Sequence, residues 1–330
     1  MRLTYIFRHP NVGYSIQRVF QTIIQGIKEN NEMNVSEFFL PNPRSDIKSI
    51  LKNGRALKKS SSKNIHITGD AHYLLYFLKK NSSIITVHDI MYLSYLSGLK
   101  RVVWKILYVV SLKRAKKIIF ISDFAKNQVL KEVFLPGEKF TIIPNPIPPE
   151  FAHHPKNFDK KNPTILHING HLERKNLGRT IEAIQNLKCR LRIIGKLSSA
   201  NINLLNKYNI SYSVAQNLTN EEVINEYINC DIVNFPSLLE GFGMPIIEGQ
   251  AIGRPVVTSN IPPMKDVAGE GGLTVDPKSV LEIREAYKNL IENDEFRNKV
   301  VTDGLINVER FKLGRIAQQY QSVYNECFIS

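Results

Sequence analysis

The sequence has few cysteines that could form disulfides and no apolar stretch long enough to cross a membrane. Only three of its 330 residues are cysteines, Cys189, Cys230 and Cys327, and no two of them have the spacing of a metal site or a CxxC motif. Three widely spaced cysteines favour a reducing compartment and argue against a disulfide framework. The most apolar later stretch, residues 102–112, is interrupted by Lys105 and is shorter than the roughly 20 apolar residues of a membrane span.

The amino terminus offers no secretion signal either. Its one short apolar run, residues 3–7, leads into Arg8 and His9 and is too short for the apolar core of a signal peptide. We therefore expect a protein of the cytoplasm. With 43% hydrophobic and 22% charged residues, the composition is that of a globular protein, and the length is typical of two domains.

Acidic residues are scarce in the first half of the chain. Residues 1–150 hold 23 Lys and Arg against 10 Asp and Glu, whereas residues 151–330 hold 21 against 20. This asymmetry indicates an anionic partner for the first half, such as a membrane surface or a phosphorylated acceptor. No RNP-like strand, zinc finger or recognition-helix pattern is present, so we expect no nucleic-acid partner. Residues 100–117 read as one basic helix, for which a place on anionic lipid and a place in the core both stay open.

Short β-rich runs alternate with helical patterns along the chain, which predicts parallel sheets with helices on both faces. Expected strands lie at residues 3–7, 35–40, 65–68, 84–87, 117–121, 140–143, 164–169, 191–194, 231–236 and 255–259, and expected helices include 15–29 and 316–328. Six prolines between Pro144 and Pro163 break this alternation. We place the link between two domains there. The expected domains are 1–150 and 151–312, with 313–330 a closing helix that packs back on the first.

Chemistry concentrates in the segment E-G-F-G-M-P-I-I-E, residues 240–248. It follows an expected strand, and Pro245 stands where a first helical turn would begin. Glu240 then lies in the loop and Glu248 about one turn into the helix. Glycine-rich backbone at a helix N-terminus favours phosphate or sugar oxygens, and carboxylates accept hydrogen bonds from vicinal sugar hydroxyls. Two glutamates at this spacing are common on surfaces, so the interpretation depends on the glycines, Pro245 and the preceding strand.

Together with its neighbours, this segment resembles the retaining glycosyltransferases of family 4, the glycosyl transferases group 1. Further matching motifs are I-S at 121–122, I-P-N at 143–145, N-G-H-L-E-R-K-N-L at 169–177, G-R-P-V-V-T-S at 253–259 and D-P at 276–277. The resemblance covers about residues 83–280. It implies the GT-B fold, an α/β architecture in which two Rossmann-like domains present parallel sheets across a cleft, the first binding acceptor and the second binding donor.

The resemblance also implies roles for single residues. Glu248 would bind the ribose hydroxyls of a nucleotide, and Glu240 would contact the donor sugar. Arg174 and Lys175 would neutralise the departing diphosphate, a place where preorganised cations stabilise developing charge. A solvated basic pair is the alternative for these two. Neighbouring backbone completes the expected donor-binding set, at Gly170, Phe242, Gly243 and Met244.

The first half offers fewer candidates. His88 follows an expected strand, and the resemblance implies that it lies near donor sugar and acceptor, where a neutral imidazole would bind a hydroxyl or take the acceptor proton. Capping a turn is its alternative role. Gly13 would let a phosphate or the acceptor approach the backbone, although this chain has one glycine where the family often has two. Asp70 and His72 fit surface positions better than a site.

The sequence shows no constellation of acidic residues for a divalent metal, and the resemblance implies a reaction without metal or cofactor. The predicted function is transfer of a hexose-type sugar, with retention, from a UDP- or GDP-linked donor to a glycan or lipid-linked acceptor in surface polysaccharide synthesis. The enzyme would lie in the cytoplasm or on the inner face of the plasma membrane. Two alternatives stay open: a sugar phosphorylase or nucleotide-sugar epimerase on the same fold, and a non-catalytic nucleotide-sugar-binding scaffold at the membrane.

Overall fold

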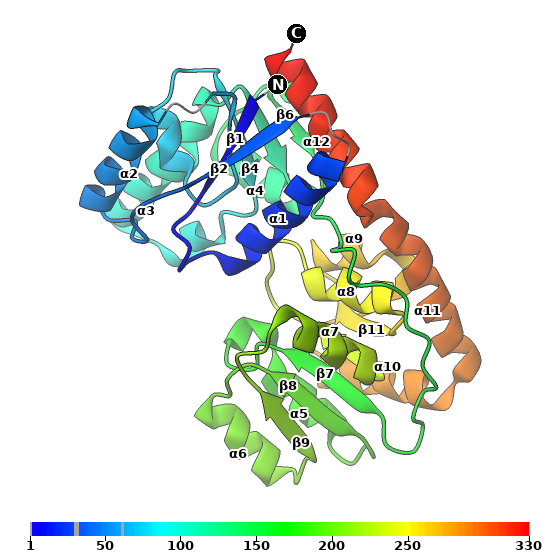
Figure 1. Ribbon diagram of the computed structural model, residues 1–330. Helices are drawn as coiled ribbons and strands as arrows, with labels where there is room; N and C mark the ends of the chain where they lie inside the picture. The colour runs from blue at the N-terminus through cyan, green and yellow to red at the C-terminus, as the bar shows by residue number, and fades with distance from the viewer. Residues whose placement is uncertain (1, 30–32, 61–62, 330) are drawn as a thin grey trace. The chain divides into compact units, whose positions relative to one another are not determined.

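A computed structural model describes residues 2–29, 33–60 and 63–329, which form two compact units. The first unit comprises the chain up to Pro148 together with the segment from Leu313 onward, and the second runs from Pro149 to Lys312. Each unit contains one six-stranded sheet (Figure 1). All strand pairings in the described residues are parallel, which confirms the architecture predicted from the alternating pattern.

The first sheet has the strand order β2-β1-β3-β4-β5-β6. Its strands are β1 (Arg2–Phe7), β2 (Asn34–Phe39), β3 (Ile65–Ile67), β4 (Ser83–Val87), β5 (Lys117–Phe120) and β6 (Phe140–Ile142). The α-helices of this unit are α1 (Tyr14–Glu29), α2 (Ile47–Lys59), α3 (Gly98–Tyr108), α4 (Asp123–Glu132) and α12 (Leu313–Phe328), and its 3-10 helices are His72–Tyr76, Met91–Tyr95, Val110–Arg114 and Gly137–Lys139. The expected strands of this half are all present, with ends that differ by one residue.

The prediction of one basic helix over residues 100–117 is wrong. Helix α3 ends at Tyr108, a 3-10 helix follows at Val110–Arg114, and β5 begins at Lys117. Two consecutive β-branched residues, Val109 and Val110, lose side-chain freedom in a helix, which weakens it at this point. Ile118 and the two residues after it are fully buried in the sheet, and that burial favours a strand over a longer helix.

Helix α12 is attached to the first sheet by a buried polar network. The Tyr324 hydroxyl lies 2.8 Å from the Tyr5 hydroxyl and 2.7 Å from His66 Nδ1, and His66 Nε2 lies 2.9 Å from Thr86 Oγ1. Burial lowers the pKa of His66 to about 3, and the neighbouring His88 contributes to the shift, so the ring is neutral at ordinary pH. Helix α1 packs beside α12 (Figure 1), where Gly26 leaves room for Leu313.

The second sheet has the strand order β12-β11-β10-β7-β8-β9. Its strands are β7 (Thr164–Ile168), β8 (Arg190–Ile194), β9 (Tyr212–Ala215), β10 (Ile232–Phe235), β11 (Val256–Ser259) and β12 (Gly272–Val275). Its α-helices are α5 (Leu177–Ile184), α6 (Ser199–Lys207), α7 (Asn220–Asn229), α8 (Met244–Ile252), α9 (Met264–Ala268), α10 (Val280–Glu292) and α11 (Asp294–Asn307), and its 3-10 helices are Glu173–Lys175, Gly269–Gly271 and Val308–Phe311. The capping box predicted at Thr219 and Glu222 is present at the start of α7.

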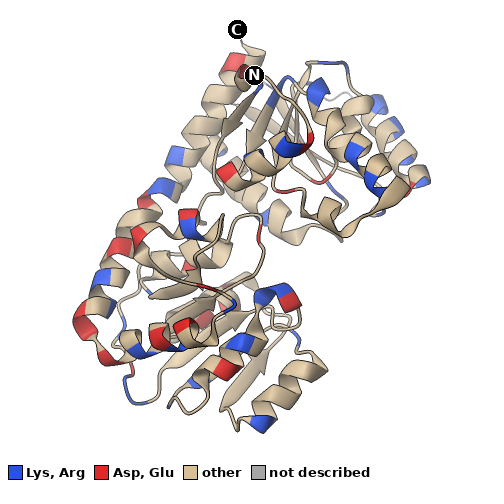
Figure 2. Cartoon of the chain, turned by 180° about the vertical axis from the view of Figure 1, so that it is seen from behind, with Lys and Arg blue, Asp and Glu red and all other residues tan. Residues whose placement is uncertain are grey.

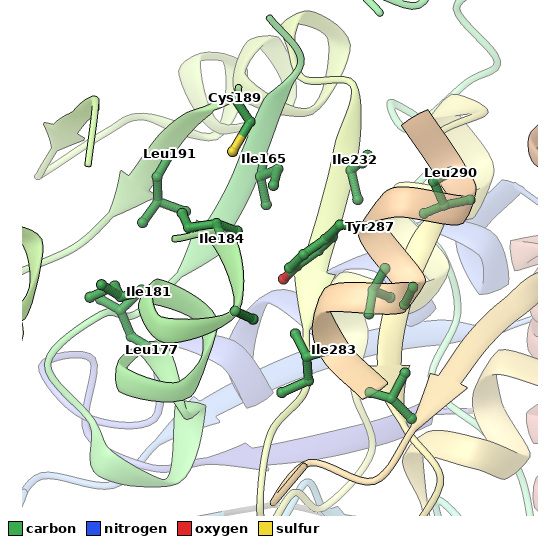
Figure 3. Packing of buried hydrophobic residues seen from close by; sticks show 14 of the residues in the cluster. Ile165, Leu177, Ile181, Ile184, Cys189, Leu191, Ile232, Ile283, Tyr287 and Leu290 are labelled. Carbon is green, nitrogen blue, oxygen red and sulfur yellow. The ribbon is translucent and has the colours of Figure 1, made fainter. Parts of the chain in front are cut away.

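A buried hydrophobic cluster joins this sheet to α5 and α10. Figure 3 shows Tyr287 pointing from α10 toward the strands that carry Ile165 and Ile232, with Ile184 of α5 beside it. The Tyr287 hydroxyl donates a hydrogen bond to Asn234 Oδ1 in β10. The cluster therefore fixes β7 and β10, the two central strands, against the helices that cover them.

The segment from residue 143 to residue 163 contains no helix or strand, in agreement with its proline content. Its second part packs on the second unit: Lys156 pairs with the buried Asp231, and Phe158 contacts the hydrophobic cluster. Figure 2 shows Lys and Arg recurring along helices of the first unit, whereas positive and negative residues are mixed in the second. No described helix is long and apolar enough to cross a membrane.

The network at Tyr324 gives a stability prediction. Tyr324→Phe removes the hydroxyl shared by Tyr5 and His66 and leaves buried polar atoms unsatisfied, at a cost of about 1–3 kcal/mol. We expect faster hydrogen–deuterium exchange in α12 and α1, measured by mass spectrometry of their peptides. Ser322→Ala is the matched control, since it removes an exposed hydroxyl of the same helix. Equal exchange in both variants would show that the network does not hold α12.

Candidate functional site

The second unit has a topological switch point between its central strands. From β7 the chain adds β8 and β9 on one side of the sheet, and it then returns to place β10, β11 and β12 on the other side. β7 and β10 are therefore neighbours, and the loops that follow them leave the same edge of the sheet in opposite directions. In open α/β sheets, ligands bind at this position, beyond the carboxyl ends of the strands.

These two loops carry the predicted charged residues and bring them into contact. Arg174 and Lys175 lie in the 3-10 helix after β7, and Glu240 lies in the loop after β10. Arg174 Nη1 is 2.7 Å and Lys175 Nζ is 2.8 Å from the same Glu240 oxygen, Oε1. Lys175 Nζ also lies 4.4 Å from the centroid of the Phe235 ring, a cation–π contact.

The environment of Lys175 is unusual for a lysine. Its side chain is 6% exposed, against 33% for Arg174. Burial lowers the pKa of the Lys175 ammonium, and the nearby positive charge of Arg174 lowers it further, whereas Glu240 and, to a smaller extent, Glu248 raise it. Glu240 is thus the main group that keeps the buried ammonium charged.

Hydrogen bonds between the two loops fix this arrangement. The Leu238 amide donates to the Arg174 carbonyl at 2.7 Å. The Asn176 side-chain amide donates to the carbonyls of Pro236 and Pro277 at 2.9 and 2.6 Å. Asn176 adopts the left-handed backbone conformation, with φ at 65°, and so turns the chain from the 3-10 helix into α5.

Glu248 is held from a different direction. It lies in the second turn of α8 and is 7% exposed, and its Oε2 accepts a hydrogen bond of 2.5 Å from the Tyr227 hydroxyl of α7. Tyr227 is fully buried and packs edge-on against Phe151. The negative charge of Glu248 also favours the charged form of Lys175, though less than Glu240 does.

The remaining predicted donor-binding residues have clear structural positions. Gly243 is the N-cap of α8 and has φ at 115°, a conformation that favours glycine, and Met244 is the first residue of the helix. The Phe242 ring is buried and packs edge-on against Phe311. At Gly170 a Cβ would lie 2.9 Å from methyl groups of both Ile193 and Leu177, so a larger residue would have to displace these side chains and packing alone favours glycine.

His88 and Gly13 belong to the first unit. His88 follows β4 and is 7% exposed, and its Nε2 lies 2.9 Å from the Thr68 carbonyl. A carbonyl only accepts, so Nε2 carries the hydrogen and Nδ1 is the accepting nitrogen of the neutral ring. Burial lowers the pKa of His88, and Asp70 and the Thr68 carbonyl partly oppose that shift. Gly69 makes room for the ring, because a Cβ there would lie 2.6 Å from His88 Cδ2.

Gly13 lies directly before α1 with φ at 77°, and its carbonyl accepts from the Gln17 amide. The surface position expected for His72 is wrong. His72 is 1% exposed, and its Nδ1 donates to the carbonyl of Tyr108, the last residue of α3. Asp70 has φ at 47° and pairs with Arg8 at 3.5 Å. Nothing in the local sequence around His72 marks a partner 36 residues away.

Tyr227, Asn176 and Gly69 were not among the predicted site residues. Tyr227 has no local signal, since its partner Glu248 comes from another helix. Asn176 precedes a helix, but its side chain makes no cap hydrogen bond and donates instead to the carbonyls of Pro236 and Pro277, so its role could not be predicted from its position. Among the described residues, no group of three or more His, Cys, Asp or Glu could hold a metal ion. Metal independence stays a prediction.

Two family models match this chain, and the boundary between them falls close to the boundary between the two units. Residues 30–151 match the family model described as Glycosyltransferase Family 4, and residues 150–304 match the model described as Glycosyl transferases group 1. The two matches are contiguous and together reach over most of the chain.

The relatives named here are at most 28% identical to this chain. The O-antigen chain mannosyltransferase RfbU of Salmonella typhimurium is 28% identical over 72% of this chain and 67% of its own length. The O-antigen chain mannosyltransferase B of Escherichia coli is 24% identical over 65% of this chain, a match that spans 61% of that relative. The crystal structure of Anabaena HepE with UDP and glucose has a TM-score of 0.77 at 14% identity and covers 99% of this chain and 100% of HepE, a likeness of fold.

The shared carboxylate gives a prediction for Lys175. Glu240→Gln removes the charge that opposes burial, so the pKa of Lys175 falls and the ammonium loses its proton at lower pH. Reductive methylation requires the neutral amine, and mass spectrometry across a pH series should show earlier modification of Lys175 in this variant. Glu173→Gln, a charge change in the same 3-10 helix, is the control and should leave the profile in place. Coincident profiles for Glu240→Gln and the native protein would contradict the assignment.

Proposed function

We propose that this chain, which belongs to the glycosyltransferases of family 4 and group 1, transfers a hexose with retention from a nucleotide-sugar donor to a glycan or lipid-linked acceptor. The observation that carries the proposal is the position of Arg174, Lys175 and Glu240 at the switch point of the second sheet. Cations, a carboxylate and a helix N-terminus meet there at one strand edge. A diphosphate joined to a sugar needs these groups side by side.

Donor binding would exchange partners within this cluster. The diphosphate would take Arg174 and Lys175, and Glu240 would turn from the two cations to the hydroxyls of the donor sugar. Lys175 remains balanced by an anion before and after the exchange, so its buried charge is never left alone. When the bond between sugar and phosphate breaks, charge develops on the leaving phosphate, and both cations are already in place to stabilise it.

Glu248 would hold the nucleotide. Its Oε2 accepts from Tyr227, and a carboxylate has further acceptor sites for the two ribose hydroxyls. Anabaena HepE was crystallised with UDP and glucose, which supports a UDP-linked sugar, whereas the relatives named mannosyltransferases leave GDP-linked mannose as the second donor to test. Surface polysaccharide synthesis is the process proposed for this chain, in line with those relatives.

The reaction would need no metal and no cofactor, because the two cations and the backbone at α8 meet the charge of the diphosphate. His88 would lie near donor sugar and acceptor, Gly13 would let a donor phosphate or the acceptor approach the backbone, and the rest of the first unit would serve the acceptor. The proposed location is the cytoplasm, at the inner face of the plasma membrane. Three buried free cysteines are consistent with a reducing compartment.

Lys175→Ala tests the proposed chemistry. We expect turnover to fall by about 10²–10³, because one charge partner of the transition state is lost. Thermal-shift screening with UDP, GDP and their sugars first identifies the donor, since a specific ligand raises the melting temperature. Calorimetry and a transfer assay then follow the variant.

Lys265→Ala is the control for this variant, because it removes an exposed lysine of the same unit. Turnover near the native value in Lys175→Ala would reject the site. Donor binding without hydrolysis or transfer to any acceptor would instead point to a scaffold. Release of sugar 1-phosphate that depends on phosphate and not on nucleotide would point to a phosphorylase.

Membrane attachment is tested separately by co-sedimentation with vesicles. We expect binding to phosphatidylglycerol vesicles that weakens as salt is added, and little binding to phosphatidylcholine vesicles, because the surplus charge of the first half acts over a Debye length. Equal binding to both kinds of vesicle would exclude an electrostatic contact with anionic lipid.

A further inference from the structure

A cavity of about 900 Å³ lies wholly within the first unit. This volume falls within the range of about 300–1,000 Å³ that is typical of small-molecule sites. Its walls come from the residues that follow β1, β3 and β4 and from one face of α3. The strand order places β1 and β3 side by side, although β2 separates them in sequence, so the cavity opens at the switch point of the first sheet.

One end of the cavity is apolar. Leu99, Val103 and Leu107 recur every four residues on α3, and all three line the cavity. Tyr108 is the only residue of α3 that is buried, whereas Leu99 is 77% exposed and Val103 is 45% exposed. An amphipathic helix normally buries its apolar face against a core, and here much of that face borders open space.

Aromatic rings continue this apolar wall toward the sheet. Trp104 stacks on Tyr108 with ring centroids 4.6 Å apart and planes 6° from parallel, and Tyr92 lies 5.9 Å from Trp104. All three rings line the cavity. Stacked rings in such a wall form a rigid surface for a hydrocarbon chain or for the apolar face of a sugar.

The other end is polar and nearly balanced in charge. Arg8, Asp70 and Asp89 follow β1, β3 and β4 and line the cavity. Arg8 pairs with Asp70 at 3.5 Å, and Lys100 of α3 also lines the cavity, so two positive and two negative lining residues balance and leave no surplus positive charge for a phosphate. Carboxylates and a guanidinium together suit a group that both donates and accepts hydrogen bonds, as sugar hydroxyls do.

From these features we infer that the cavity binds an amphiphile with a sugar headgroup and a hydrocarbon chain. The hydroxyls lie at Asp70 and Asp89, and the chain lies along the face of α3. The acceptor is then a glycolipid or lipid-linked sugar. That role rests on the proposed transfer reaction, whereas the binding itself does not.

Tryptophan fluorescence reports on this cavity directly, because Trp104 is the single tryptophan of the chain. The probes are octyl glucoside and octyl mannoside below the concentration of micelle formation, compared with octanol, glucose and mannose. We expect a saturable change in Trp104 emission with an octyl glycoside, at least about tenfold tighter than with octanol or the free hexoses. Binding of octanol as tight as that of both glycosides would overturn the sugar headgroup.

Two neighbouring valines of α3 form a matched pair of variants. Val103 lines the cavity and Val102 does not, although their exposures are 45% and 53%. Val103→Asp should weaken glycoside binding at least about tenfold, because its carboxylate would lose water against the chain, whereas Val102→Asp should leave it unchanged. Both sites are exposed, so both variants should fold. Equal effects, or no saturable response in the native protein, would overturn the proposal.

Asp70→Asn tests the polar end, and asparagine accepts the left-handed backbone at this position. Glycoside binding should weaken several-fold and octanol binding should not change; unchanged glycoside binding would remove the headgroup from this end. Nucleotide binding by the same variants, measured by calorimetry, separates this proposal from the transfer reaction. Glycoside binding without nucleotide binding would reject the proposed transfer reaction and leave the cavity assignment intact. Nucleotide binding without glycoside binding would reject the cavity assignment and leave the transfer reaction intact.

Discussion

The parallel pairing of β7 with β10 is the constraint on which the candidate donor site depends. These strands are adjacent in the sheet, although paired residues are 67 positions apart in sequence, as in the pairs Ile232 with Ile165 and Asn234 with His167. Because parallel neighbours end at one edge, the loop with Arg174 and Lys175 meets the loop with Glu240 there. The Tyr287 packing that fixes both strands is thus also what holds the cations and the carboxylate in register.

Burial makes this cluster different from a surface ion pair. An exposed pair contributes little, but a buried ammonium with one carboxylate partner leaves a large penalty when that partner is lost. Lys175 and Glu240 have side chains that are 6% and 10% exposed, and Arg174 shares the same oxygen. A site that binds a diphosphate needs cations that stay charged while it is empty. Glu240 favours the charged form of Lys175 while the site is empty. An incoming diphosphate would then compete with Glu240 for Arg174 and Lys175.

Local patterns in the sequence were enough for most of the fold. Apart from the helix expected over residues 100–117, the elements predicted from apolar periodicity, the capping box at Thr219 and the proline-rich stretch have ends within a few residues of the observed ones. Strands β9 and β12 were not among the expected strands. The loop positions of Arg174, Lys175 and Glu240 were also predicted, because strand, loop and helix N-terminus are consecutive. Contacts across the fold were not: the Tyr227 partner of Glu248 and the burial of His72 depend on helices that meet only after folding.

Charge shows the same limit of sequence reasoning. Residues 98–117 hold seven Lys and Arg and no Asp or Glu. In the fold, several of them have structural partners: Arg101 and Lys105 pair with Glu132, and Arg114 donates to backbone carbonyls. Local pairing leaves the net charge of the unit positive, and a field of this kind acts on a membrane at long range and is screened by salt. The apolar face of α3 and the balanced polar end of the cavity act at contact distance. Under the proposed function, the first unit would therefore have two separable means of meeting an acceptor: its net charge would attract the membrane that carries the acceptor, and the cavity would select the molecule.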